Sequence, residues 1–273
     1  MEADDFENWF RDRIAVAREL PNLLFEALHE LRPAGFAAVE MPAATVWRFN
    51  LAASSQFRAA LFCLLDQETT LGSLALLRGL IETWAHLDFI LGDFKADANC
   101  RALALEVGMR RQRVELLGHA KSPVSGEQIA AAKQNLMAVE ELKKQAGCRN
   151  KARSYGNVDA TVKSISQREG FDWLVDMWRS ASETAHMAGW DWLLTVGPDG
   201  APVLTYPGQG HRASRFQHLI CLYDNLGRTS LQILTGRPDI EIPDDSVIRR
   251  FGGAAADLFN DSDLKVAIDR ASD

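Results

Sequence analysis

The chain has 273 residues, enough for one large or two small domains, and hydrophobic residues make up 47% of it, which allows a sizeable core. The net charge of −7 argues against broad, non-specific nucleic-acid binding, although it is compatible with a local basic site. The acidic first ten residues lack the pattern of a signal peptide, and no apolar run is long enough to span a membrane. We therefore expect a cytoplasmic protein without a membrane partner.

Apolar residues recur at helical spacing along most of the chain, which predicts an all-α protein. The segment 74–91 is apolar on nearly every side, as is typical of a buried helix. Pro21 predicts a kink or a break near Leu20. We expect a helical bundle of about seven helices, drawn from residues 4–31, 43–65, 74–91, 95–119, 125–145, 158–167, 171–187 and 211–234.

The helical pattern of apolar residues ends near residue 194. Short apolar runs flank a turn-rich segment that contains Gly-Pro-Asp-Gly, which predicts a small β-hairpin insert near 194–206. Gly236 and Pro238 end the last long helix. The sequence thus predicts a single helical domain over 1–236, followed by a loosely packed C-terminal tail over 237–273 with at most two short helices.

The four cysteines are scattered and form no Cys-x-x-Cys pair, so we expect reduced thiols. They are Cys63, Cys100, Cys148 and Cys221. A separate cluster of cations, Arg110, Arg111 and Arg113, makes a basic patch on the predicted helix 95–119.

One polar stripe interrupts the apolar helix 74–91. Arg78, Glu82 and His86 follow one another at i, i+4 and i+8. Because Arg and Glu are seldom buried without a partner, this stripe indicates a charged group inside the core or in a cleft that opens on it.

A second polar stripe occurs about a hundred residues later, in the predicted helix 171–187. Arg179, Glu183 and His186 fall on one side of that helix, and Ser182 lies at the edge of the same face. We expect the two stripes to form a shared polar centre, which would bind a ligand or an RNA phosphate. Its members are Arg78, Glu82, Arg179, Ser182, Glu183 and His186.

The pair Arg179-x6-His186 resembles the motif of the HEPN (higher eukaryotes and prokaryotes nucleotide-binding) superfamily. The resemblance implies a metal-independent endoribonuclease without a cofactor, which would act on RNA at the interface of a homodimer. His186 would be the general base or acid, and Arg179 would stabilise the negative charge of the transition state.

The sequence also resembles an uncharacterised bacterial family, domain of unknown function 5677, over about residues 43–234. Members of that family are similar in having an Arg-x3-Glu helix, here Arg78 and Glu82. A later helix carries an aromatic residue, a Ser and a His, here Trp178, Ser182 and His186. The family has no settled activity that could be carried over to this chain.

Two alternatives do not involve ribonuclease chemistry. The first is a non-catalytic interaction or regulatory module, in which Arg78 and Glu82 form a structural, buried ion pair. The second is a di-iron carboxylate bundle, because Glu-x-x-His occurs twice, although the order of the helices differs from the known pattern. Its ligands would be Glu26, His29, Glu183 and His186, with Glu82 and Glu106.

Overall fold

The computed structural model describes most of the chain. The described residues are 3–31, 41–92, 98–119, 125–148, 158–168, 170–185, 194–196, 198, 201–204, 208–235 and 246–269.

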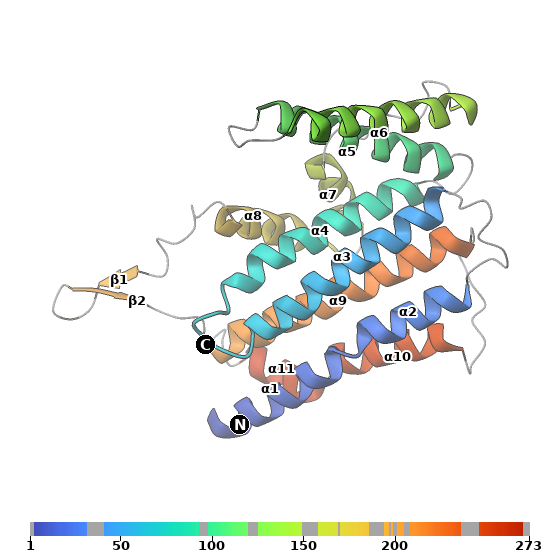
Figure 1. The fold of residues 1–273 in the computed structure, drawn as a ribbon. Coiled ribbons are helices and arrows are strands. Elements are labelled where there is room, and N and C mark those ends of the chain that lie inside the picture. Colours follow the sequence, from blue (N-terminus) through green and yellow to red (C-terminus); the bar gives the residue numbers. More distant parts are fainter. Residues whose placement is uncertain are drawn as a thin grey trace.

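Helices dominate the described residues and confirm the all-α class (Figure 1). They outnumber the roughly seven helices that the sequence predicted, because 4–31 divides into two helices and 246–269 adds two more. No helix in these stretches is both long and apolar enough to cross a bilayer. The helices are α1 (Ala3–Ala17), α2 (Leu20–Glu30), α3 (Met41–Cys63), α4 (Gly72–Leu91), α5 (Ala98–His119), α6 (Gly126–Gln145), α7 (Val158–Ser166), α8 (Leu174–Ala185), α9 (Gln209–Thr235), α10 (Val247–Phe259) and α11 (Ser262–Asp269).

Two short strands lie within the region where the sequence predicted a hairpin insert. Strand β1 (Leu194–Val196) pairs antiparallel with β2 (Pro202–Leu204), so that Leu194 lies opposite Leu204.

The predicted kink near Leu20 is a break between two helices. Helix α1 ends at Ala17, and α2 begins at Leu20 with Pro21 in its first turn. Proline fits that position because the first backbone N–H groups of a helix have no partner within the helix.

Helix α4 is central, as its all-round hydrophobicity predicts. It packs against α3, α9, α8, α7 and α5 (Figure 1). Its side chains Leu77, Leu80, Ile81 and Leu87 are completely buried. A helix that has neighbours on several sides requires apolar residues on all of those sides, which explains the sequence pattern.

Polar pairs join the three central helices inside the core. Because each of these buried donor groups has an acceptor, the pairs stabilise one register of α3, α4 and α9. The contacts are Asn50 Nδ2 to Ser230 Oγ at 2.9 Å, Ser54 Oγ to Tyr223 Oη at 2.8 Å, and Trp84 Nε1 to Thr229 Oγ1 at 3.1 Å.

Residues 246–269 belong to the core and not to a loose tail. Helices α10 and α11 bury Phe251, Leu258 and Leu264 in the same apolar cluster as α9. Helix α10 also packs on α2, and the two lie side by side in Figure 1. The acidic composition of 237–273 concealed this amphipathic pattern, in which one side of a short helix is fully apolar.

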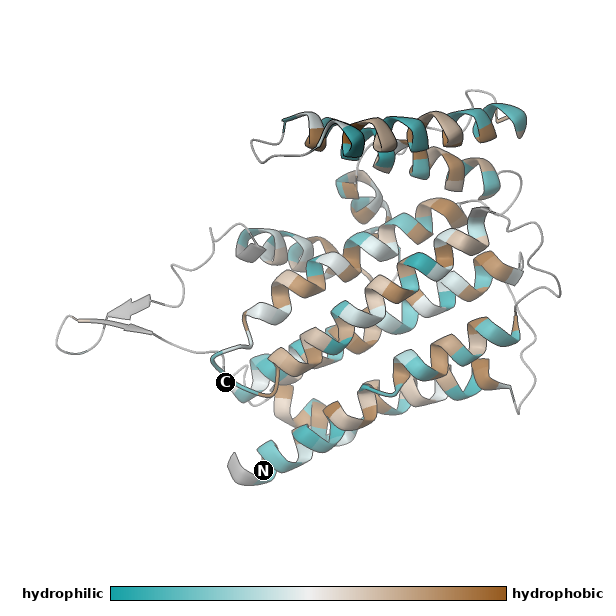
Figure 2. Ribbon diagram, viewed as in Figure 1, coloured by the Kyte–Doolittle hydropathy of each residue, from teal (hydrophilic) through white to brown (hydrophobic). Residues whose placement is uncertain are grey.

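Helices α5 and α6 form an antiparallel pair at one end of the molecule, with hydrophilic residues along their length (Figure 2). A disulfide joins Cys100 near the start of α5 to Cys148 just after α6, so the prediction of reduced thiols is wrong for these two residues. The other two, Cys63 and Cys221, are free. The pairing depends on how α5 and α6 fold against each other, and the spacing of 48 residues does not reveal it.

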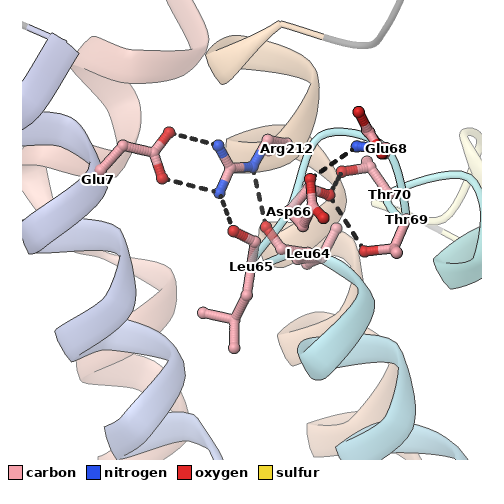
Figure 3. Close-up of polar contacts among 8 residues, drawn as sticks. All are labelled: Glu7, Leu64, Leu65, Asp66, Glu68, Thr69, Thr70 and Arg212. Atoms are coloured by element: carbon pink, nitrogen blue, oxygen red, sulfur yellow. Dashed lines mark hydrogen bonds and ion pairs between the residues drawn. The ribbon is translucent and has the colours of Figure 1, made fainter.

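Arg212 connects α9 to α1 and to the turn that follows α3. Its side chain is buried, and its guanidinium donates to both carboxylate oxygens of Glu7, at 2.5 and 3.1 Å. It also donates to the carbonyl oxygens of Leu64 and Leu65, at 2.9 and 3.1 Å (Figure 3). The rings of Phe6 and Phe10 lie against the same cation. This arrangement satisfies a buried charge almost completely.

Candidate functional site

The first predicted stripe forms an ion pair on α4. Arg78 Nε lies 3.0 Å from Glu82 Oε1, and the guanidinium of Arg78 covers the ring of Trp178 on α8 at 5.2 Å. The two charged side chains are 26% and 35% exposed, so the pair is half-buried and not sealed in the core. The structure thus brings Arg78 of the α4 stripe against one side of α8.

The second stripe lies on other sides of α8. Arg179 is 65% exposed, and its nearest acidic partner is Asp176, at 3.7 Å. Because successive residues of a helix are about 100° apart, Trp178 can face α4 while Arg179 faces solvent. Ser182 is half-buried and Glu183 is exposed. His186 lies outside the described residues.

A cleft of about 560 Å³ lies between α8, α9 and the start of α4, and we call it the α8–α9 cleft. Its size is within the range of small-molecule sites. Of the residues that the sequence predicted to form a polar centre, Glu183 lines this cleft. The residues that line it from α9 were not among the predicted site residues. Its lining residues are Leu74, Trp173, Asp176, Met177, Ser180, Glu183, His211, Ser214, Arg215 and His218.

Arg215 is the central cation of this cleft. Its side chain is 8% exposed, and Nη1 donates to the carbonyl oxygen of Thr70 at 3.2 Å. No carboxylate of the described residues lies within ion-pair distance of it. Burial lowers the pKa of Arg215 to about 10, so the guanidinium still carries its charge at neutral pH.

Two histidines extend the α9 wall. The ring of His218 lies 4.8 Å from that of Trp173, whose indole N–H donates to the carbonyl oxygen of Gly170 at 2.9 Å. Burial lowers the pKa of His218, and the charge of Arg215 acts in the same direction. His218 is therefore neutral at pH 7 and able to accept or donate one hydrogen bond. His211, one helical turn before Arg215, is exposed.

The opposite wall carries the negative charge. Asp176 and Glu183 line the cleft from α8, whereas Arg215 and the histidines line it from α9. The cleft therefore offers a cation from α9 and carboxylates from α8, and the apolar side chains of Leu74 and Met177 also line it.

A signal for Arg215 was present in the sequence. Arg212 and Arg215 occur at helical spacing with Phe216 and Leu219, on the apolar side of the predicted helix 211–234. A cation at such a position is buried, and a buried cation needs a partner or a ligand.

The described residues contain no group of three or more His, Cys, Asp or Glu side chains that could hold a metal ion. Three carboxylates of the di-iron alternative have arginine partners. Glu106 pairs with Arg48 and Arg110, Glu82 pairs with Arg78, and Glu26 lies 3.7 Å from Arg250.

Comparison with known proteins identifies no relative: no family model, no curated protein and no solved structure matches this chain.

Proposed function

We propose that this chain binds a small organic anion in the α8–α9 cleft, with the anionic group of the ligand paired to Arg215. The observation that carries the proposal is a buried guanidinium with no carboxylate partner among the described residues. Removing such a charge from water is costly unless an anion compensates for it. A ligand phosphate or carboxylate would accept the remaining N–H donors in charge-assisted hydrogen bonds.

The carboxylates on the α8 wall favour a ligand that also has an amino group. Asp176 forms an ion pair with Arg179, whereas Glu183 has no ion pair in the described part of the chain. A ligand with an anion at one end and an ammonium group at the other would satisfy both walls. Its apolar middle would lie against Leu74 and Met177. The ligand class is therefore a small zwitterion, either an amino phosphate or an amino acid.

Calorimetric titration of the full chain tests this proposal with two matched pairs of probes. The first pair is 2-aminoethyl phosphate and ethyl phosphate, and the second is 3-aminopropionate and propionate. We expect the amino member of each pair to bind more tightly. Comparing the affinities of the phosphate pair with those of the carboxylate pair shows which anionic group the cleft binds.

Variants then assign binding to the cleft. Arg215→Met should abolish binding of the carboxylate probes and the difference between the two phosphate probes, and Glu183→Gln should remove the preference for the amino probes. Arg228→Gln is the matched control, because Arg228 is exposed on the same helix and pairs with Asp224 at 2.8 Å. The proposal is wrong if no probe binds, or if Arg215→Met binds the probes as the wild type does.

A metal-independent endoribonuclease, acting as a homodimer, is the second candidate. One observation favours it: Arg179 is 65% exposed on α8, beside the cleft residue Ser180 in the sequence, so its guanidinium is accessible to an RNA phosphate. The test is cleavage of single-stranded RNA in the presence of a chelator. Loss of cleavage in both Arg179→Ala and His186→Ala supports it, and equal cleavage by wild type and His186→Ala excludes it.

A further inference from the structure

A second cavity, of about 410 Å³, lies among α3, α5 and α6, and we call it the α5–α6 cavity. It is separate from the α8–α9 cleft and shares no lining residue with it. Three arginines line it, two of them from the basic patch that the sequence shows on α5. They are Arg48, Arg110 and Arg113.

One buried carboxylate organises these cations. Glu106 is 3% exposed, and it forms ion pairs with Arg48 and with Arg110, whose Nε lies 3.4 Å from Glu106 Oε2. That Nε atom is buried and has no hydrogen-bond acceptor among the described residues. Arg113 forms no ion pair with any of the described residues. Three guanidinium groups against one carboxylate leave two positive charges in the cavity wall.

The sequence spacing explains the shape of the site. Glu106, Arg110 and Arg113 recur at i, i+4 and i+7, so α5 presents one charged face to the cavity. The facing side of α6 has small residues at 131 and 132, between Gln128 and Asn135. Two alanines leave space there, and the flanking amides add neutral donors at its edges.

We propose that the α5–α6 cavity is a binding site for a phosphate group that carries two negative charges. Two excess positive charges match a phosphate dianion, and planar guanidinium groups bind pairs of phosphate oxygens. The amide groups of Gln128 and Asn135 complete the set of donors. This site is independent of the proposed zwitterion cleft, because no residue is common to both.

Titration of the full chain with inorganic phosphate at pH 8, where it is a dianion, tests the site. We expect one equivalent to bind with a dissociation constant below about 1 mM. Arg113→Gln should weaken binding by about tenfold or more, since it removes charge-assisted hydrogen bonds. Arg113 is the variant of choice because it is exposed and no described ion pair depends on it, whereas substitution of Arg48 would leave Glu106 with less compensation.

Arg111→Gln is the matched control. Arg111 belongs to the same basic patch but pairs with Glu140 at 2.6 Å and does not line the cavity. Its substitution should leave the affinity for phosphate unchanged, and so should Arg215→Met in the cleft. An equal loss of affinity in Arg111→Gln would overturn the site, as would a loss in Arg215→Met or no effect of Arg113→Gln. Succinate, which is also a dianion, would overturn the phosphate assignment if it bound as tightly as phosphate.

Discussion

Arg212 and Arg215 lie three residues apart on α9 and are both buried, but only Arg212 pairs with a carboxylate in the described part of the chain. The turn after α3 contacts both of them. Leu64 and Leu65 accept hydrogen bonds from Arg212, and Thr70 accepts one from Arg215. One helix thus carries a satisfied buried cation and, one turn later, a cation that is open to the α8–α9 cleft.

This difference predicts opposite effects of the same substitution. Arg212→Met should lower the free energy of unfolding by about 2–4 kcal/mol, because Glu7 and two carbonyl oxygens lose charged donors. Arg215→Met should be neutral or stabilising by up to about 1 kcal/mol without ligand, because it replaces an uncompensated buried charge by an apolar side chain. Urea unfolding measures both values. Equal destabilisation by the two variants would contradict this account of Arg215.

Gly227 on α9 permits a close approach of α10. A Cβ atom at this position would lie 2.6 Å from two ring atoms of Phe251 and 3.2 Å from Leu24 Cδ1. We expect Gly227→Ala to destabilise the fold by about 1–3 kcal/mol, because Phe251 is buried and has little room to move.

Gly253 on α10 is the control for that substitution. It is also helical, but a Cβ atom there meets nothing within 4 Å. Gly253→Ala should raise the free energy of unfolding by about 0.5–1 kcal/mol through helix propensity. If both variants were stabilising in thermal unfolding, the close packing of α9 against α10 would be disproved.

The disulfide between Cys100 and Cys148 should contribute to stability. It closes a loop with a sequence separation of 48 residues, for which loop entropy alone corresponds to about 4 kcal/mol, and measured values are commonly about 2–4 kcal/mol. Cys100→Ser should therefore shift the urea midpoint to lower concentration, and reductant should do the same to the wild type. Reductant should have no further effect on Cys100→Ser, and a large residual effect would contradict the assigned pair.

The pH dependence of stability should report His86. Burial lowers the pKa of His86 to about 4, while its ring stacks on Phe49 at 5.2 Å, and the charge of Arg48 also lowers the pKa. The unfolded chain takes up a proton near pH 6.5 and the folded chain near pH 4, so stability is lost as the pH falls through this interval. The loss due to His86 amounts to about 3 kcal/mol.

Substitution of His86 isolates this contribution. His86→Gln should lose less stability than the wild type between pH 7 and pH 4.5, as measured by urea unfolding at each pH. His218, whose pKa is also lowered, contributes in the same direction in both proteins and cancels in the difference. Identical pH profiles would show that His86 takes up its proton equally in the folded and unfolded chains.

The sequence predicted what depends on local pattern. The all-round hydrophobicity of 74–91 correctly indicated a central buried helix, and Pro21 marked the break between α1 and α2. The ion pair between Arg78 and Glu82 follows from their i, i+4 spacing. Each of these features needs only residues within a few turns of one helix.

What the sequence did not predict depends on contacts between distant segments. Arg215 becomes a candidate site residue because a cleft lies beside it, between α8 and α9. That no described carboxylate pairs with it depends on the fold and cannot be predicted from the sequence. The partner of Arg212 lies 205 residues away, on α1. Arg179 belongs to a polar stripe in the sequence, but which side of α8 faces its neighbours is decided by Trp178, Leu174 and Ala181.

The bond between Cys100 and Cys148 makes α5, α6 and the chain between them a closed ring of covalent bonds. A protease that cuts the backbone once anywhere inside this ring leaves a single molecule, and two fragments separate only after reduction. The α5 and α6 walls of the α5–α6 cavity would therefore stay tethered in nicked protein. Comparing reduced and non-reduced gels would reveal such a cut, which an activity or binding assay alone would miss.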